Sequence, residues 1–288
     1  MPKRTKFSDS AGATLKDYYY YLDLLTELAV SSFHYDGLPE TIDERFLELT
    51  LFTDGQIVYF NDDIMGLLAL QVITSGRLNV YRQPETFRAF AVNGYQRELD
   101  QQTGVICYNN NMRTPSFPAV ERFARKLATY EQIIWVNANA QKTPVLITGT
   151  EQQRLTLKNV YMQWDGNQPA IFGDKNADWN ALSTLRTDAP YVADKVTELK
   201  YNTWHEALTY LGISNITITK KERMVKDEVY RMMGGVIMNR YMRLKPRQQA
   251  VDRVNRMFGT NISVEYQEDY EKAAKAIVDN DLQEDETS

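Results

Sequence analysis

Residues that could act as nucleophiles, acid–base groups or metal ligands are few and scattered in this sequence. There is one cysteine, Cys107, and there are two histidines, His34 and His205. These residues are too few for a Cys/His zinc site. Cys107 lies in a run of β-branched and aromatic residues, which indicates a small core residue rather than a nucleophile. We interpret His34, before a Gly-Leu-Pro turn, and His205, on a helical pattern, as half-buried surface side chains in preference to catalytic bases.

The motifs of the common catalytic classes are also missing from the sequence. It has no glycine-rich phosphate loop ending in Lys-Ser or Lys-Thr, which excludes a P-loop ATPase, and no Gly-x-Ser-x-Gly nucleophile elbow. Asp62 and Asp63 could bind a metal, but a turn is the favoured interpretation of this pair. Together these absences favour a structural or binding protein with no catalysis, no cofactor and no metal.

Composition and charge limit the kind of partner. The chain has 288 residues, of which 43% are hydrophobic, so it is long enough to bury a sizeable core. The net charge of −5 argues against a protein that coats nucleic acid with a broad basic face. It does not argue against a protein that lets DNA slide past, because many close phosphate contacts would hold the DNA back.

Apolar spacing predicts the elements that carry these residues. Two long helices are expected over 118–142 and 189–213, the first opened by a proline and the second closed by Gly212. Strands at 145–147, 155–157 and 170–172 form a small β insertion between them. The other expected elements are helices from Thr14 and over 43–50, 62–75, 220–230, 247–257 and 270–278, and strands over 56–60, 78–81, 87–92, 104–108 and 262–264. The fold class that follows is α+β.

Several blocks of this sequence resemble one known family. The segment from Glu131 to Ile147 reads EQIIWVNANAQKTPVLI, and Tyr108-Asn109-Asn110 precedes the run Pro115-Ser116-Phe117-Pro118. Further blocks are Thr187-Asp188-Ala189-Pro190-Tyr191-Val192 before Asp194-Lys195, and Lys220-Lys221-Glu222-Arg223-Met224-Val225 before Asp227-Glu228-Val229. With these blocks at matching spacing over nearly the whole chain, the sequence resembles the upper collar, or head–tail connector, proteins of phi29-like short-tailed phages, also called portal proteins.

The resemblance implies a ring of twelve identical subunits at one vertex of the phage head. Double-stranded DNA would enter through the ring during packaging and leave through it at ejection. Each subunit would combine an α/β wing, long stem helices and a β-rich clip. The implied divisions are a disordered basic tail at 1–13, a wing at 14–117, a stem helix at 118–142, a clip at 143–188, a stem helix at 189–213, a channel helix and loop at 214–245, and a wide-end crown segment with an acidic tail at 246–288.

The resemblance also implies which side chains face the DNA. These are the basic residues Arg186, Lys195, Lys220 and Lys221, each of which a ring would repeat as a circle of charges. An arginine holds phosphate more tightly than a lysine, because the guanidinium can form two parallel hydrogen bonds. From the residues alone, the alternative is that Lys195 and Lys220 form exposed helix pairs with Glu198 and Glu222.

A glycine-split loop is expected where this family has its mobile channel loop. Its residues are Arg231, Met232, Met233, Gly234, Gly235, Val236, Ile237 and Met238. They are more apolar than the Ser/Asn/Glu-rich loop of the phi29 type, so the loop would grip DNA sterically or seal the channel, with simple subunit packing as the alternative. At the N-terminus, Lys3, Arg4 and Lys6 permit the contact with a packaging RNA that some relatives make.

The implied partners are further copies of the chain, the major capsid protein, double-stranded DNA, the lower collar or tail protein, the packaging ATPase and a packaging RNA. The implied location is the capsid vertex of the virion, after assembly in the host cytoplasm. The nearest alternative is a tail or adaptor ring protein of the virion. A phage DNA-processing enzyme is the alternative from another class.

Overall fold

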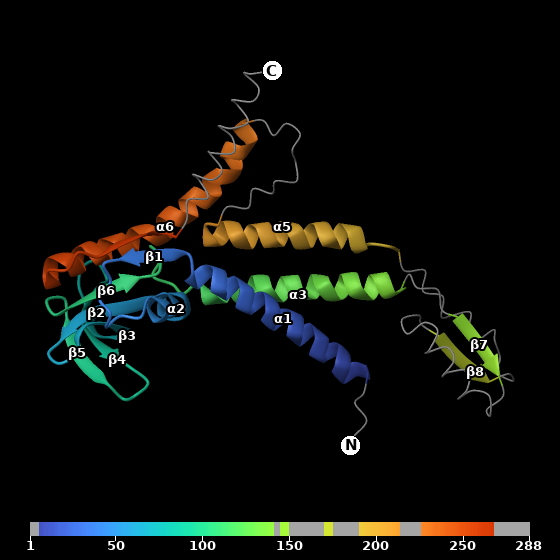
Figure 1. Cartoon of the computed structure of the whole chain (residues 1–288), viewed down its shortest axis with the longest axis horizontal. Helices are drawn as coiled ribbons and strands as arrows, with labels where there is room; N and C mark the ends of the chain where they lie inside the picture. The colour runs from blue at the N-terminus through green and yellow to red at the C-terminus, as the bar shows by residue number, and fades with distance from the viewer. Residues whose placement is uncertain (1–5, 141–144, 150–169, 175–189, 214–225, 268–288) are drawn as a thin grey trace. The chain divides into compact units, whose positions relative to one another are not determined.

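The computed structural model of the chain describes residues 6–140, 145–149, 170–174, 190–213 and 226–267 (Figure 1). The described residues of 1–17 and 126–203 form a first compact unit, and those of 18–125 and 204–288 form a second. The helices are α1 (Lys6–Val30), α2 (Glu44–Asp54), α3 (Phe117–Ala140), α5 (Ala193–Leu211) and α6 (Lys226–Phe258). The strands are β1 (Phe33–Asp36), β2 (Gln56–Asp62), β3 (Gly66–Leu78), β4 (Pro84–Phe90), β5 (Gln96–Asp100), β6 (Gly104–Tyr108), β7 (Val145–Gly149), β8 (Ala170–Asp174) and β9 (Ser263–Tyr266). The predicted mixture of helix and sheet is confirmed.

The second unit is built on a five-stranded antiparallel sheet with the strand order β5-β4-β3-β2-β6. Strand β3 takes part in two pairings: its residues 66–70 pair with β2 and its residues 71–78 pair with β4. The second pairing contains a bulge at Gly76, whose φ of 79° suits glycine. The sheet curls far enough that Tyr95, before β5, bonds to Asp62 at the end of β2.

Both faces of this curled sheet are buried. The face toward α2, α6 and the β1–β9 ribbon carries Ile57, Tyr59, Leu67, Ala69, Val105 and Cys107. The opposite face closes on itself through Val58, Phe60, Leu68, Val72, Phe87, Ala89 and Leu99. Because successive side chains of a strand point to opposite faces, one apolar run in β2 or β3 supplies both cores.

Local signals explain the helix that precedes this sheet. The carboxylate of Asp43 caps α2 by accepting a hydrogen bond from the Phe46 N–H at 2.9 Å. At the other end Gly55 adopts a φ of 81°, and its N–H donates to the Leu51 carbonyl at 3.0 Å. An added Cβ at Gly55 would lie 2.7 Å from the Pro115 nitrogen, so this position requires glycine on two counts.

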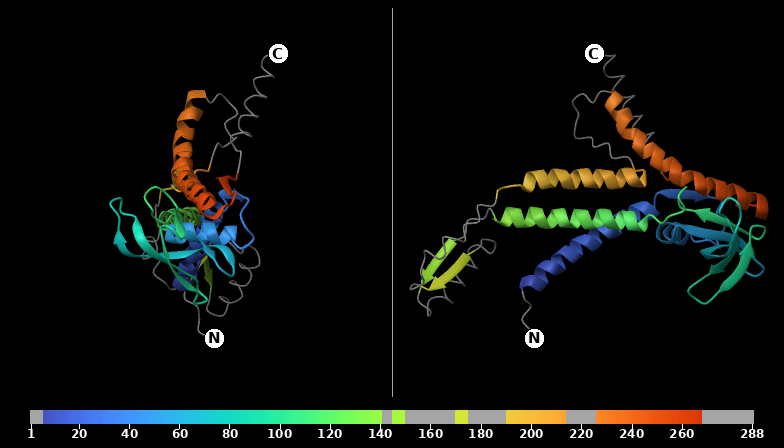
Figure 2. Two further views of the ribbon diagram at one scale, coloured as in Figure 1. Left: turned by 90° about the vertical axis from the view of Figure 1, so that its left-hand side faces the viewer. Right: turned by 180° about the vertical axis from the view of Figure 1, so that it is seen from behind.

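Helix α6 corrects the expectation of a glycine-split loop at 231–238. All eight of those residues lie inside one helix of 33 residues, which bends along its length (Figure 2). Glycine disfavours helix by only about 1 kcal/mol per residue, and contacts to the end of α5 offset that cost. Asn239 donates to the Thr209 carbonyl at 2.9 Å, and Arg240 donates to the Gly212 carbonyl at 2.6 Å. Pro246, also inside α6, removes one backbone donor, which is a usual cause of a bend.

The first unit consists of the start of α1, most of α3, the first part of α5 and the β7–β8 pair. In Figure 1 and Figure 2, α3 and α5 run side by side in opposite directions. Strands β7 and β8 pair in parallel, from Val145 opposite Ala170 to Gly149 opposite Asp174. None of the helices in the described part of the chain is long and apolar enough to cross a membrane.

Several sequence predictions are confirmed as elements. The helices expected over 43–50, 118–142 and 189–213 correspond to α2, α3 and α5. The strands expected at 56–60, 104–108, 145–147, 170–172 and 262–264 correspond to β2, β6, β7, β8 and β9. The strand expected at 155–157 and the helix expected at 270–278 lie outside the described residues.

Other predictions are wrong. The helix expected over 62–75 is mostly strand β3, because a strand buried on both faces loses the alternation that identifies strands. The strand expected over 78–81 is largely a turn, in which the Asn79 carbonyl accepts from the Arg82 N–H. The disordered tail expected over 1–13 is helical from Lys6, because extending an apolar helix costs less than starting one.

Candidate functional site

The contact between α3 and α5 in the first unit depends on one asparagine. The side-chain oxygen of Asn137 in α3 accepts hydrogen bonds from the N–H groups of Val192 at 2.9 Å and Ala193 at 3.1 Å. Its amide nitrogen donates to the Pro190 carbonyl at 3.0 Å. Asn137 thus serves as an N-terminal cap for α5, supplied by the neighbouring helix rather than by the helix itself.

Ionic and polar contacts hold the same helices together further along. The Lys200 ammonium lies 2.8 Å from the Glu131 carboxylate, and Gln132 donates to Asp17 at 2.5 Å, which joins α3 to α1. Lys195, five residues before Lys200, is exposed, and within the described residues no ion pair involves it. The alternative pairing with Glu198 is therefore not formed in the structure, and the ammonium of Lys195 is available to a partner.

Large apolar side chains of this helix pair face solvent. The exposed ones are Ile133, Trp135, Val136, Tyr191, Leu199 and Tyr201. An exposed apolar surface on a helix pair is typical of a contact with another chain. The pair therefore presents both a lysine and an apolar surface outside its own core.

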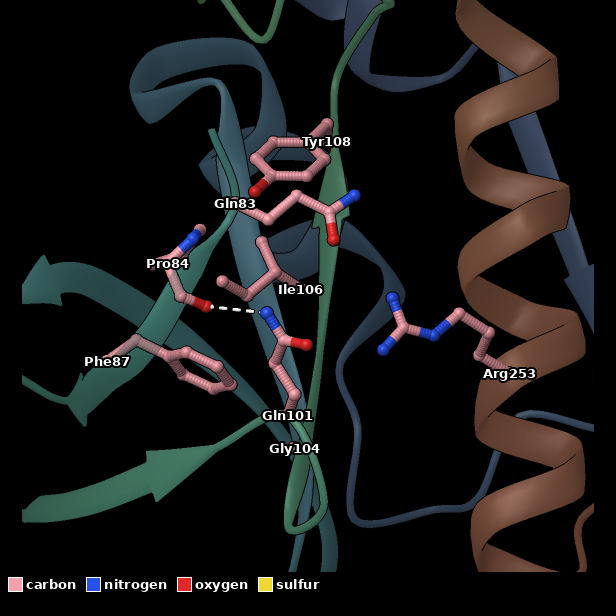
Figure 3. A pocket seen from close by; sticks show the side chains of 8 residues that line it. All are labelled: Gln83, Pro84, Phe87, Gln101, Gly104, Ile106, Tyr108 and Arg253. Atoms are coloured by element: carbon pink, nitrogen blue, oxygen red, sulfur yellow. Dashed lines mark hydrogen bonds between the residues drawn. The ribbon is translucent and has the colours of Figure 1, made fainter. Parts of the chain in front are cut away.

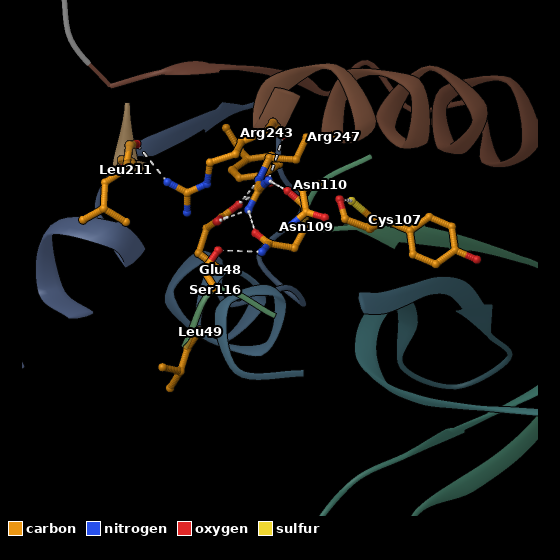
Figure 4. Close-up of polar contacts among 12 residues, drawn as sticks. Glu48, Leu49, Cys107, Asn109, Asn110, Ser116, Leu211, Arg243 and Arg247 are labelled. Atoms are coloured by element: carbon orange, nitrogen blue, oxygen red, sulfur yellow. Dashed lines mark hydrogen bonds and ion pairs between the residues drawn. The ribbon is translucent and has the colours of Figure 1, made fainter. Parts of the chain in front are cut away.

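The second unit holds a fully buried ion pair between α2 and α6 (Figure 4). Arg247 donates from Nε to Glu48 Oε1 at 2.8 Å and from Nη2 to Glu48 Oε2 at 2.7 Å. Its remaining donors bond the carbonyls of Asn109 and Arg243, both at 2.8 Å, and the Asn109 side chain at 3.2 Å. All five N–H groups of the guanidinium are therefore satisfied, which is the condition for burying such a charge.

The surroundings of this pair extend it into a network. The Tyr35 hydroxyl donates to Glu48 Oε1 at 2.6 Å, and the guanidinium of Arg247 stacks 3.9 Å from the ring centroid of Phe33. Asn109 donates to Ser116 Oγ at 2.8 Å. The network thus links β1, α2, the segment after β6 and α6 through polar groups rather than through packing alone.

Electrostatics in this core argue against catalysis by its titratable groups. Burial lowers the pKa of Arg247, but the charge and hydrogen bonds of Glu48 more than offset this, so its pKa is raised and it stays charged. Burial and the neighbouring Glu48 raise the pKa of Tyr35 well above its usual value. Burial also raises the pKa of the Cys107 thiol to about 12, so the thiolate is absent near neutral pH. The interpretation of Cys107 as a core residue is confirmed.

The other candidate reactive residues also have structural surroundings. Asp62 accepts from the N–H groups of Ile64 at 2.9 Å and Met65 at 3.0 Å, which confirms the predicted turn. His34 is exposed on β1, beside Asp36 at 3.4 Å. His205 is partly buried in α5. Among the described residues there is no cluster of three or more His, Cys, Asp or Glu side chains that could hold a metal ion.

Only part of the predicted channel set falls within the described residues. Lys195 does, and it is exposed. Arg186, Lys220, Lys221, Lys3 and Arg4 lie outside them, and Lys6 is the first residue of α1. Within the predicted channel segment, Val236 is buried while Ile237 and Met238 are exposed on α6.

The comparison with known protein families covers almost the whole chain. Residues 12–271 match the family model described as Phage Connector (GP10). The chain belongs to the phage connector family. As a connector it is a virion component that joins head and tail, and connectors are structural proteins. The connector is also similar to a chain in the solved structure of the portal and tail of native bacteriophage P68, with 14% identity, 100% of both chains covered and a TM-score of 0.49.

Sequence reasoning missed the buried pair of this connector. Arg247 is followed by two glutamines and Glu48 lies in a helix with other charged residues, so both resemble surface positions. Asn109 and Asn137 each lie in a sequence block that carries the family resemblance, and this is the signal that could have identified them. Their roles as side-chain bonding partners were not predicted.

Proposed function

We propose that twelve copies of this connector assemble into a closed ring whose central channel carries double-stranded DNA into the head and out of it. The match to the connector family over residues 12–271 is the observation that carries this proposal. The ring would be a passive conduit, without catalysis and without a cofactor. It would be assembled in the host cytoplasm and would occupy one vertex of the capsid.

For the subunit we propose the division that the family resemblance implies. Residues 14–117 would form the wing, α3 and α5 the stem, 143–188 the clip and 246–288 the crown. The exposed apolar side chains of the stem, including Trp135 and Leu199, support contacts between neighbouring subunits. The partners we propose are the major capsid protein, the lower collar or tail protein, the packaging ATPase and a packaging RNA bound by Lys3, Arg4 and Lys6.

The channel surface would carry the basic positions Arg186, Lys195, Lys220 and Lys221. The exposure of Lys195 and its lack of an ion pair within the described residues support this assignment. Repeated around a ring, one lysine per subunit makes a circle of charges that attracts the DNA backbone. Residues 231–238 would line the channel as part of α6, with Ile237 and Met238 as exposed apolar contacts.

Electron microscopy of the purified full chain tests the ring. A cone-shaped ring with a wide and a narrow end is expected, and a monodisperse monomer would contradict the proposal. The variant Lys195→Glu tests the channel assignment in a DNA-packaging assay. It should change DNA translocation or retention and leave rings intact, while Lys16→Glu, an exposed lysine on α1 of the same unit, serves as the matched control. Loss of rings in Lys195→Glu alone would place Lys195 at a subunit contact instead.

A further inference from the structure

A small cavity opens on the curled sheet of the second unit (Figure 3). Its volume is about 30 Å³, and it is lined by Gln83, Pro84, Phe87, Gln101, Gly104, Ile106, Tyr108 and Arg253. Phe87 and Ile106 make part of its wall apolar, while Gln83, Tyr108 and Arg253 add polar groups. A space of this size admits one or two water-sized atoms, such as the oxygens of a phosphate group.

Positive charge gathers around this cavity. Figure 3 shows the guanidinium of Arg253 reaching from α6 toward the strand that carries Ile106 and Tyr108. The guanidinium of Arg113 stacks 4.5 Å from the ring centroid of Tyr108 and donates to the Arg82 carbonyl at 3.1 Å. Two arginines from separate parts of the chain, Arg113 and Arg253, therefore lie near one tyrosine.

These arginines have no carboxylate partner within the part of the chain that the structure describes. On the same sheet, Arg88 pairs with Glu98 at 2.5 Å, and Arg97 pairs with Asp62 at 3.2 Å. Two arginines of the sheet are thus neutralised, whereas Arg253, which lines the cavity, and Arg113, which stacks on the cavity residue Tyr108, are not. Guanidinium groups in such a position are suited to an anion with several oxygens, because they donate in pairs.

Two tight turns position Arg113: its own turn, and the turn of Arg82, whose carbonyl accepts from the Arg113 guanidinium. Asn79 accepts from the N–H groups of Tyr81 and Gln83, both at 2.9 Å, which closes the turn that contains Arg82. The carbonyl of Asn110 accepts from the Arg113 N–H at 2.9 Å in a second turn. Arg82 and Arg113, with φ of 56° and 59°, are the non-glycine residues with positive φ among those described. Such backbone conformations cost roughly 1–2 kcal/mol each, so both turns adopt a fixed and unfavourable geometry where the arginines meet.

The tyrosine supplies a neutral donor. Burial raises the pKa of Tyr108, while Arg113 and Arg253 act in the opposite direction. Its hydroxyl therefore keeps its proton near neutral pH and can donate to an anionic oxygen. Gln101 is held in place by the hydrogen bond from its amide nitrogen to the Pro84 carbonyl at 2.9 Å.

We propose that Arg113, Arg253 and Tyr108 form a binding site for a phosphate group of a polynucleotide backbone. The site reads charge and not base sequence, and it lies on the curled sheet rather than on the proposed channel residues. It therefore goes beyond the proposed channel function and does not depend on Lys195 or on ring closure. In an oligomer the site would be repeated once per subunit, so weak single contacts would add up.

Binding of a fluorescent 20-base-pair DNA duplex to the full-length protein, followed by anisotropy over a series of salt concentrations, tests the site. We expect Arg113→Gln/Arg253→Gln to weaken binding by about tenfold at 0.1 M salt, and the slope of log K against log salt to fall by about 0.9, because the two arginines together hold one phosphate. As a control, Arg88→Gln removes one charge, where the double variant removes two, from an exposed arginine that is already paired, and it should change affinity less than twofold. Tyr108→Phe keeps the ring under Arg113 and should weaken binding a few-fold.

Three results would overturn the proposal. The first is a double variant that binds as tightly as the unchanged protein, and the second is an equal loss in Arg88→Gln, which would mean general charge attraction. The third is a polyglutamate peptide whose affinity depends on these arginines, while the affinities for the DNA duplex and for an RNA duplex of the same sequence do not. If the double variant loses affinity for the DNA duplex, the RNA duplex or both, the site is supported. The duplex that the unchanged protein binds more tightly is then the source of the phosphate. Unchanged thermal unfolding of the variants shows that any loss comes from the site.

Discussion

The buried pair between Glu48 and Arg247 makes a prediction that can be worked out from the structure. In Glu48→Gln the side chain keeps its shape but loses its charge, and its amide nitrogen faces a guanidinium that has only donors. Arg247 then loses the partner of its Nε or its Nη2, and its own charge stays buried, with 0% of the residue exposed. Removing one member of a buried ion pair costs about 3–5 kcal/mol. That is a large share of the roughly 5–15 kcal/mol that stabilises a domain.

Urea unfolding of the full chain, followed by tryptophan fluorescence, measures this cost. The control is Glu98→Gln, which removes a carboxylate whose side chain is 62% exposed and lies 2.5 Å from Arg88. An exposed pair of this kind contributes about 0–1 kcal/mol. The double variant Glu48→Leu/Arg247→Met should cost less than the sum of its single variants, because it leaves neither charge buried. If Glu48→Gln and Glu98→Gln destabilise equally, or if the double variant costs the full sum, the interpretation of this pair as the polar anchor of α6 is refuted.

Three further predictions concern single positions. Asn137→Ala removes the cap of α5 and should lower the free energy of unfolding by about 1–2 kcal/mol in thermal unfolding. In the control Asn139→Ala, the replaced side chain makes no hydrogen bond among the described residues, so the free energy should change little. Equal effects of the two substitutions would reject the cap. Hydrogen bonds from the Tyr95 hydroxyl and from backbone N–H groups lower the pKa of Asp62 from 3.8 to about 2, so its stabilising effect is present above pH about 4 and is lost as the pH falls toward 2. Melting temperatures of Asp62→Asn should therefore lie below those of the unchanged protein at pH 7 and approach them near pH 2, and a constant gap across this range would contradict the assignment. Gly55→Ala should destabilise the protein by about 1–3 kcal/mol, because its φ is 81° and the new Cβ would meet backbone after β6; a neutral effect on chemical unfolding would show that the turn adapts.

The long helices and most strands could be predicted from the sequence because their signals are local. Pro118 near the start of α3 and Gly212 after α5 mark helix ends, and the φ of 79° at Gly212 is the conformation that such an end needs. The run from Gly66 to Leu78 could not be predicted in this way, because side chains of its first half enter two different cores in alternation, which makes that half continuously apolar. The loop predicted at Gly234 and Gly235 was wrong for the opposite reason. The glycine pair is locally unfavourable for a helix, but contacts to α5 keep helix α6 intact across it.

In the candidate site, the sequence predicted only those residues whose charge fits DNA binding and whose position also matches the family. Lys195 was named from its match to the family, and the structure adds that it is exposed. The arginines around Tyr108 were not singled out, because an unpaired arginine is ordinary at the surface. What distinguishes them is that Arg113 stacks on Tyr108 from a tight turn and that Arg253 lines a cavity together with Tyr108, and both are tertiary features.

The blocks that carry the family resemblance have a physical reason to be specific. Asn109 and Asn137 belong to two such blocks, and each uses its side chain as donor and acceptor at once. Asn137 accepts from two N–H groups of α5 and donates to a carbonyl before it. Asn109 accepts from Arg247 and donates to Ser116. An aspartate at either place would lose the donor, and a leucine at the buried position 109 would leave polar groups unpaired, at about 1–3 kcal/mol each. Packing tolerates many residues of similar volume, but this bonding pattern admits few, so the identities at such junctions are set by hydrogen bonds between elements far apart in the chain.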